Sequence, residues 1–148
     1  MKIYLGFRIS GSSYEAVTKY VSNVQEELDS CGYTVMHPMT GKESLRTETQ
    51  FKAHDYAGIP PATNHAIFER DIWMVRQCDV FYLNLMGAGE RVSIGGVMEL
   101  AVAAALGKHT VVSMGAENIH RHAFVLEAAD VIYETHEEAM KYLERLML

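Results

Sequence analysis

Glu99 is the only acidic side chain in Gly96–Leu106, an apolar segment whose composition is typical of a helix. The pattern places Glu99 in the first helical turn, where an acid stabilises the helix dipole and needs no further role. An ionised carboxylate at that position also suits attack on an electrophilic carbon. The anomeric carbon of a sugar is such a centre, because the transition state of glycosidic cleavage is oxocarbenium-like. Both interpretations of Glu99 stay open on position alone.

Asp71 is a second candidate for chemistry. It lies in Asn64–Gln77, a segment with helical periodicity, between aromatic and aliphatic residues that predict close packing around it. A carboxyl group in such surroundings has a raised pKa and can give a proton to a leaving group. An ion pair with Arg70, Arg76 or another basic neighbour explains Asp71 equally well. Glu99 and Asp71 are thus candidates for two carboxyl groups with separate roles.

The loop Gly87–Gly96, with the sequence GAGERVSIGG, leads into the apolar helix. Glycines such as Gly95 and Gly96 let backbone amides approach a ligand, and amides at a helix start favour an anion. Ser93 adds a hydroxyl group and Arg91 a positive charge to the same region. The spacing matches neither a dinucleotide-binding motif nor a P-loop. The loop is therefore either an anion-binding cradle or a tight turn.

Short apolar runs alternate with helical patterns along the chain. Strands are predicted at Lys2–Phe7, Tyr33–Pro38, Asp79–Met86, His109–Met114 and Asp130–Glu134. Helices are predicted at about 12–31, 64–77, 96–106 and 120–129 and from Thr135 onward, with capping boxes at Ser12 with Glu15 and Thr135 with Glu138. This alternation predicts one α/β domain over residues 1–148, on a doubly wound (flavodoxin-like or Rossmann-like), five-stranded, mainly parallel sheet in the order 2-1-3-4-5.

In such sheets a ligand binds beyond the carboxyl ends of the strands, near the switch between the first and third strands. Three segments meet there: the residues after Gly6, those after Leu85 and the long loop Met39–Thr63. Gly6 and Arg8 would then belong to the pocket, although Arg8 is equally explained as a solvated charge.

The loop 39–63 is long for a connection inside a compact domain, so it is either disordered or a working lid. Lys42, Arg46 and His54 are its candidate substrate contacts. A solvated lid explains each of these three side chains more simply.

The composition argues against several classes of partner. A net charge of −6 gives no long-range attraction to nucleic acid polymers or to anionic membranes. Cys31 and Cys78 fit no metal-binding or redox spacing, and a strand-like segment stands where a signal peptide would begin. We therefore expect a cytoplasmic protein with a small-molecule ligand, no metal and no cofactor.

Three pieces of the chain, KIYLG, ERDIWMVRQCDVFYLNL and SIGGVMELAVAAALGK, resemble the nucleoside 2-deoxyribosyltransferase family, which includes deoxynucleoside 5′-monophosphate N-glycosidases. The family pattern has a tyrosine in the first strand and an aspartate eight residues before the aspartate that opens the third strand. A serine or aspartate then stands six residues before a catalytic glutamate. Here these positions are Tyr4, Asp71, Ser93 and Glu99.

The resemblance implies a role for each of these residues. Glu99 would attack C1′ of the sugar, Tyr4 would orient its carboxylate by a hydrogen bond, and Asp71 would assist departure of the base. Without the resemblance, a strand aromatic in the core explains Tyr4 as well.

Ser93 stands where the family divides. Members with aspartate at that position tend to act on free nucleosides, and members with serine tend to hydrolyse monophosphates, because a carboxylate repels phosphate. Ser93, with Arg91 nearby, therefore favours a 5′-monophosphate. Two loops, GAGERV and 39–63, depart from the family pattern and leave the base open.

The resemblance also implies a homo-oligomer, a dimer or larger, in which a polar residue of a neighbouring subunit completes each site. His122 is the position that aligns with this residue, and Asn118 and His120 are near alternatives. A protonated histidine is useful at a phosphate site, although surface histidines are usually idle.

These observations lead to one expected function and two alternatives. The expected function is cleavage of the N-glycosidic bond of a (deoxy)nucleoside 5′-monophosphate through a covalent glycosyl intermediate on Glu99, releasing free base and sugar phosphate. The first alternative is a nucleoside 2-deoxyribosyltransferase that exchanges bases between deoxynucleosides. The second alternative is a nucleotide-binding module that sequesters its ligand without turnover.

Overall fold

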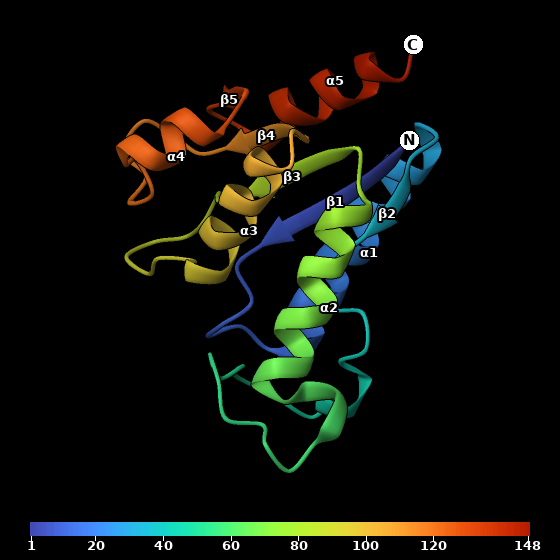
Figure 1. Cartoon of the computed structure of the whole chain (residues 1–148), viewed down its shortest axis with the longest axis vertical. Helices are drawn as coiled ribbons and strands as arrows, with labels where there is room; N and C mark the ends of the chain where they lie inside the picture. Colours follow the sequence, from blue (N-terminus) through green and yellow to red (C-terminus); the bar gives the residue numbers. More distant parts are fainter.

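Five strands form one sheet in which every neighbouring pair is parallel, in the order β2-β1-β3-β4-β5 (Figure 1). The computed structural model describes residues 1–148. Its strands are β1 (Lys2–Phe7), β2 (Thr34–Met36), β3 (Val80–Asn84), β4 (His109–Ser113) and β5 (Val131–Tyr133). The predicted strand order and doubly wound class are confirmed, and the sheet is entirely parallel.

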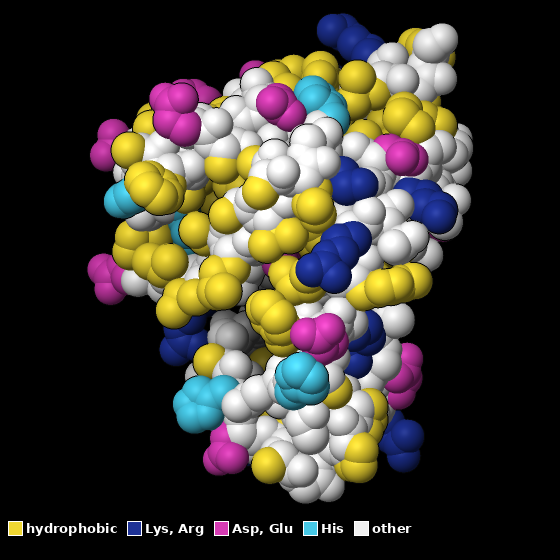
Figure 2. Space-filling view, in the orientation of Figure 1, with side chains coloured by type: hydrophobic (Ala, Val, Ile, Leu, Met, Phe, Trp, Pro, Cys, Tyr) yellow, Lys and Arg dark blue, Asp and Glu magenta, His cyan; other side chains and the backbone are white.

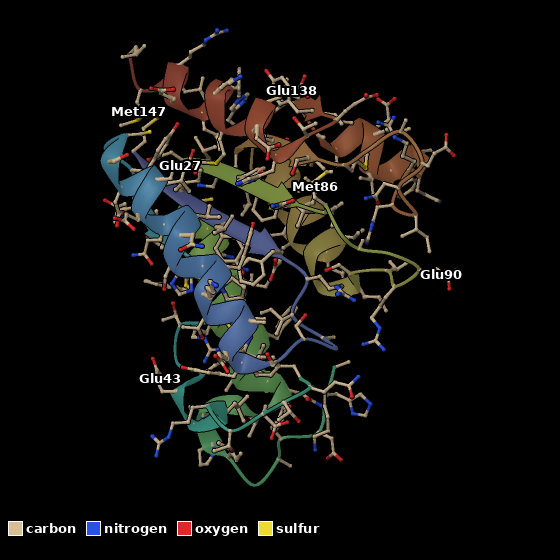
Figure 3. All side chains as sticks on the ribbon, turned by 180° about the vertical axis from the view of Figure 1, so that it is seen from behind. Glu27, Glu43, Met86, Glu90, Glu138 and Met147 are labelled. Carbon is tan, nitrogen blue, oxygen red and sulfur yellow. The ribbon has the colours of Figure 1, made fainter.

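Helices cover both faces of this sheet. They are α1 (Tyr14–Ser30), α2 (Asn64–Gln77), α3 (Ile94–Ala105), α4 (Ala123–Ala128) and α5 (His136–Leu146), with short 3-10 helices η1 (Glu43–Leu45) and η2 (Pro60–Ala62). In Figure 1, α2 and α3 lie in front of the sheet; Figure 3, turned by 180°, has α1 in front. None of these helices is both long and apolar enough to cross a membrane.

Each face of the sheet packs its own hydrophobic core, because successive strand residues point to opposite sides. In β1, Ile3 and Leu5 pack with α1 and α5, whereas Tyr4 between them packs with α2 and α3. The candidate chemistry therefore lies on the α2/α3 side of the sheet.

The N-cap of the first helix lies one residue later than predicted. Ser13, not Ser12, is the N-cap residue, and its hydroxyl accepts a hydrogen bond from the Ala16 N–H at 3.1 Å. The predicted capping box of Ser12 with Glu15 is therefore wrong. Ser12 is held by a distant segment instead, since its carbonyl accepts a hydrogen bond from the Phe51 N–H at 2.8 Å.

The loop 39–63 packs against the body of the protein. Five of its side chains are buried in the core that includes α1: Met39, Leu45, Phe51, Tyr56 and Ala62. Backbone hydrogen bonds tie it to the turn after β1, where the Gly11 N–H donates to the Phe51 carbonyl at 2.9 Å. In Figure 1 it forms the lower end of the molecule, beyond the carboxyl end of β1. It thereby supplies one wall of the crevice at that end.

Candidate active site

A cavity of about 860 Å³ opens beyond the carboxyl end of β1. Its walls come from the turn after β1, from the loop 39–63, and from residues 91–96 together with Glu99. These are the three segments that the sequence predicts around one crevice. The cavity is large enough for a nucleotide-sized ligand.

Glu99 reaches this cavity from α3, and Tyr4 of β1 holds its carboxyl group in place. The Tyr4 hydroxyl donates a hydrogen bond to Glu99 Oε1 at 3.0 Å. Tyr4 itself is fully buried and stacks on Phe81, with ring centroids 5.6 Å apart. Gly6, on the same face of β1, favours close packing on Leu83, because a Cβ there would lie 3.1 Å from a Leu83 methyl carbon, whereas its 3.6 Å distance from Glu99 Oε2 would be an ordinary contact.

The charge state of Glu99 differs from the sequence prediction. The helix α3 begins at Ile94, two residues before the predicted start at Gly96, so Glu99 lies in the second turn, not the first. The helix dipole acts mainly within the first turn. Although water reaches part of the side chain, burial raises the pKa of Glu99 to about 8, and the negative charge of Asp71 adds to this shift. The hydrogen bond from Tyr4 opposes the shift. The predicted first-turn position of Glu99 is therefore wrong, and burial favours the neutral form of its carboxyl group.

Asp71 lies on α2, where it is buried, and it does not itself line the cavity. Burial raises its pKa, and the positive charges of Lys42 and Arg70 lower it. Arg70 Nε also donates to Asp71 Oδ1 at 3.4 Å. The predicted ion-pair partner of Asp71 is therefore present as Arg70, and its role toward a leaving group stays a prediction. The negative charge of Asp71 raises the pKa of Tyr4 as well as that of Glu99, so the three groups form one electrostatic cluster.

The N-terminus of α3 presents unpaired amides to the cavity. Ser93 is the N-cap residue, but its side chain accepts no capping hydrogen bond. The backbone N–H groups of the first helical turn, residues 94–96, have no partner within the helix, and these residues line the cavity. At Gly96 a Cβ would lie 2.9 Å from both a Leu83 methyl carbon and Ser93 Oγ, so glycine is required for close packing. Gly95 has open space around it.

Positive side chains surround the same end of the cavity. Arg8 and Arg91 line it from opposite loops, and Arg91 packs over the turn after β1, where a Cβ on Gly11 would lie 2.5 Å from its Nη1. The loop 39–63 adds two lysines and one histidine to the cavity wall, Lys42, Lys52 and His54. An acidic protein therefore carries a local basic wall at its cavity. No group of three His, Cys, Asp or Glu side chains could hold a metal ion.

The loop residues differ from one another in their placement. Arg46 is exposed and does not line the cavity, and His54 is exposed at its rim. Lys42 is only 5 % exposed, so the solvated-lid interpretation is wrong for this residue. No local pattern reveals its burial, because the walls that enclose Lys42 come from distant segments.

The histidines after β4 have two different surroundings. The Ser93 N–H donates to His120 Nε2 at 2.8 Å, so the His120 proton lies on Nδ1, which donates to Asn118 Oδ1 at 2.8 Å. Burial lowers the pKa of His120, which favours this neutral form. Within their own chain, His120 and Asn118 therefore hold the loop that carries Ser93. His122 lies outside this chain's cavity, and its Nδ1 accepts a hydrogen bond from the Phe124 N–H at 3.1 Å.

Known proteins with the same architecture include two classes of nucleoside-processing enzyme. A 2-deoxyribosyltransferase from Bacillus psychrosaccharolyticus is 18% identical, with a TM-score of 0.64 over 96% of this chain and 92% of that chain. A CMP N-glycosidase from Clostridium botulinum is 17% identical, with a TM-score of 0.61 over 99% of both chains. A 2-deoxyribosyltransferase from Leishmania mexicana is 19% identical, with a TM-score of 0.63 over 99% of both chains. At these identities the likeness establishes the fold.

The family is established by sequence. No curated protein sequence matches the chain. The family model described as nucleoside 2-deoxyribosyltransferase matches residues 3–142, nearly the whole chain. The chain therefore belongs to the nucleoside 2-deoxyribosyltransferase family and is an enzyme of that glycosyl-transfer type.

Proposed function

We propose that the protein cleaves the N-glycosidic bond of a (deoxy)nucleoside 5′-monophosphate and releases the free base and the sugar phosphate. The observation that carries this proposal is the hydrogen bond from Tyr4 to Glu99 Oε1, which holds a carboxyl group at a nucleotide-sized cavity. The basic wall with Arg8 and Arg91, and the unpaired amides of α3, suit the phosphate of a 5′-monophosphate.

The reaction proceeds in two displacements. Glu99 first loses its proton to solvent. Tyr4 holds Oε1, so Oε2 of the resulting carboxylate, which accepts no hydrogen bond from the protein, attacks C1′ of the sugar. The bond between C1′ and the base nitrogen breaks with its electron pair on the base, and Asp71 gives the base a proton. Water then attacks C1′, its proton passes to Asp71, and Glu99 leaves as a carboxylate. Each proton and electron pair is thereby returned.

Transfer to a second base is the alternative within the same chemistry. Hydrolysis and transfer differ only in which molecule attacks the glycosyl intermediate, water or a second base. The loop 39–63, as a lid over the cavity, would decide this by excluding solvent. The family match, and the two solved transferases with the same fold, support this alternative.

The test is a screen of each base in nucleoside and 5′-monophosphate form, read by release of free base. We expect release from a monophosphate, and loss of turnover by about three orders of magnitude in Glu99→Ala with ligand binding retained. Glu90→Ala is the matched control, because Glu90 is exposed and lies at the tip of its loop in Figure 3. Base exchange in preference to hydrolysis would establish the transferase, and binding without turnover in the wild type would establish the sequestering module.

Removing the Glu99 charge should stabilise the fold at high pH. The folded protein holds the Glu99 proton up to about pH 8, whereas the unfolded chain loses it near pH 4.5. Wild-type stability therefore falls as pH rises between these values. Glu99→Gln should melt several degrees above the wild type at pH 8, with the difference vanishing near pH 4.5. Thermal melts across this range measure the effect. Equal melting points at pH 8 would contradict a buried carboxylate, and Glu90→Gln controls for loss of an exposed acid.

Ser93→Asp should reverse the preference for phosphate. A carboxylate beside the proposed phosphate position repels it, so kcat/KM for the 5′-monophosphate should fall at least about tenfold. Activity on the free nucleoside should fall less or rise. Ser93→Ala is the control, because it removes the hydroxyl group without adding charge. An unchanged ratio of the two activities in Ser93→Asp would place the phosphate elsewhere.

We also propose a homo-oligomer whose sites are shared between subunits. An exposed apolar surface covers α3 and the region of α4 in Figure 2, and its large members are Ile94, Met98, Ile119 and Phe124. Such a surface is typical of a protein–protein contact. His122, next to Phe124, would reach the site of a neighbouring copy.

Mixing two inactive variants tests this sharing. Glu99→Ala and His122→Ala should each lack activity, and their mixture should regain part of it. Mixed oligomers contain a site with Glu99 from one subunit and His122 from the other. Reassembled wild-type protein is the control for the mixing step. A mixture that stays inactive while forming oligomers would contradict a shared site.

A further inference from the structure

Lys42 is a buried lysine with no hydrogen-bond partner for its ammonium group. Its side chain is 5 % exposed and lines the cavity together with Glu99. No protein atom accepts a hydrogen bond from its Nζ, and it forms no ion pair in contact. Lysine is rarely buried unless another charge compensates it. Water in the cavity and negative charge nearby must therefore compensate the Lys42 ammonium group.

A backbone hydrogen bond and the Arg70 side chain of α2 hold the segment that carries Lys42. The Lys42 carbonyl accepts a hydrogen bond from the Leu45 N–H at 2.9 Å, at the start of η1. Gly41 before it has φ +77°, and a Cβ there would lie 2.7 Å from Arg70 Nη1. Arg70 Nη1 donates to the Pro61 carbonyl at 3.0 Å, near the other end of the loop. One side chain of α2 thus contacts both ends of the loop that carries Lys42.

The groups around Lys42 come from every element that packs against it. They are His37 and Glu43 from its own segment, Arg70 and Asp71 from α2, Glu99 from α3, and Tyr4 of β1, which contacts Glu99. Burial lowers the pKa of Lys42, and the Asp71 and Glu99 carboxylates raise it. The effect is reciprocal, since the charge of Lys42 lowers the pKa of both carboxyl groups.

We propose that Lys42 is a positioning residue that acts through Glu99 and Asp71, as the counter-charge that the loop 39–63 brings to these two carboxyl groups. With the loop in place, Glu99 gives up its proton more readily and becomes the charged nucleophile. Without the charge of Lys42, Arg70 would be the remaining cation beside the two buried carboxyl groups, and Glu99 would hold its proton more tightly. This inference rests on the proposed role of Glu99.

The direct test is titration of the Glu99 carboxyl carbon by NMR in protein labelled at glutamate, with Glu99→Gln identifying the signal. In Lys42→Met the pKa of Glu99 should rise by about one unit or more, and in Lys42→Arg it should stay near the wild-type value. Lys19→Met, which removes an exposed lysine from α1, is the matched control and should leave the titration unchanged. An unchanged Glu99 pKa in folded Lys42→Met overturns the proposal.

A reciprocal titration covers the case in which Lys42→Met does not fold. The pKa of the Lys42 ammonium, followed at its ε carbon, should fall in Glu99→Gln by the same coupling. No change in that pKa would overturn the proposal equally. Neither titration needs turnover, so a protein that releases no base would refute the proposed function while the role of Lys42 is still decided.

Turnover then distinguishes a charge effect from a structural one. In Lys42→Met the acidic limb of the kcat/KM profile should move to higher pH by the shift seen in the titration. About a tenfold loss is expected well below the Glu99 pKa, and little loss above it. A loss of equal size at every pH would mean that Lys42 only supports the loop, which would overturn the proposal.

Discussion

The site depends on taking the Glu99 carboxyl group out of water. Desolvation penalises the charged form of a carboxyl group, and a second carboxyl group, Asp71, adds repulsion. The protein opposes these costs with one hydrogen bond from Tyr4 and with the positive charge of Lys42. Burial and Asp71 therefore favour the protonated form of Glu99, while Tyr4 and Lys42 favour the charged form that the proposed reaction requires.

The architecture explains why these groups meet. Parallel strands end at one edge of the sheet, so β1 supplies Tyr4 and Gly6 from its α2/α3 face, while α3 begins just beyond the end of β3. Glycines at positions 6 and 96 keep the backbone of β1 and of α3 close to the Leu83 side chain. The opposite face of the sheet packs α1 and α5 and carries none of the proposed chemistry. Tyr4, Asp71 and Glu99 thus lie on one side of the sheet, while both faces carry a hydrophobic core.

Much of this fold follows from local pattern. The bounds of α2 coincide with the predicted segment 64–77, and Thr135 caps α5, where its hydroxyl accepts a hydrogen bond from the Glu138 N–H. Periodicity and turn chemistry are short-range signals, so they locate such elements well. The pairing of Tyr4 with Glu99 followed only from the family resemblance, because no local signal joins residues 95 positions apart.

Three predictions from the sequence differ from the structure: the cap of α1, the start of α3 and the exposure of Lys42. Ser13 became the cap of α1 because the Ser12 carbonyl binds the distant Phe51. The start of α3 fell two residues early, since the apolar pattern did not include the turn at Ile94. Lys42 was expected in solvent, and its burial depends on α2 and α3 together. Tertiary contacts thus decide the burial of Lys42, and its own neighbours in sequence carry no record of them.

The anchoring of the loop 39–63 limits how ligands can enter. Leu45, Phe51 and Tyr56 share a core with α1. Moving the whole segment outward would expose these apolar side chains to water, at a cost of about 2 kcal/mol for each. Within the loop, the exposed residues that line the cavity are Gln50 and the tip 52–55, and two buried aromatic residues, Phe51 and Tyr56, flank this tip. Movement of the tip alone would leave the buried anchors of the loop in place, so ligand exchange there would not disturb the hydrophobic core.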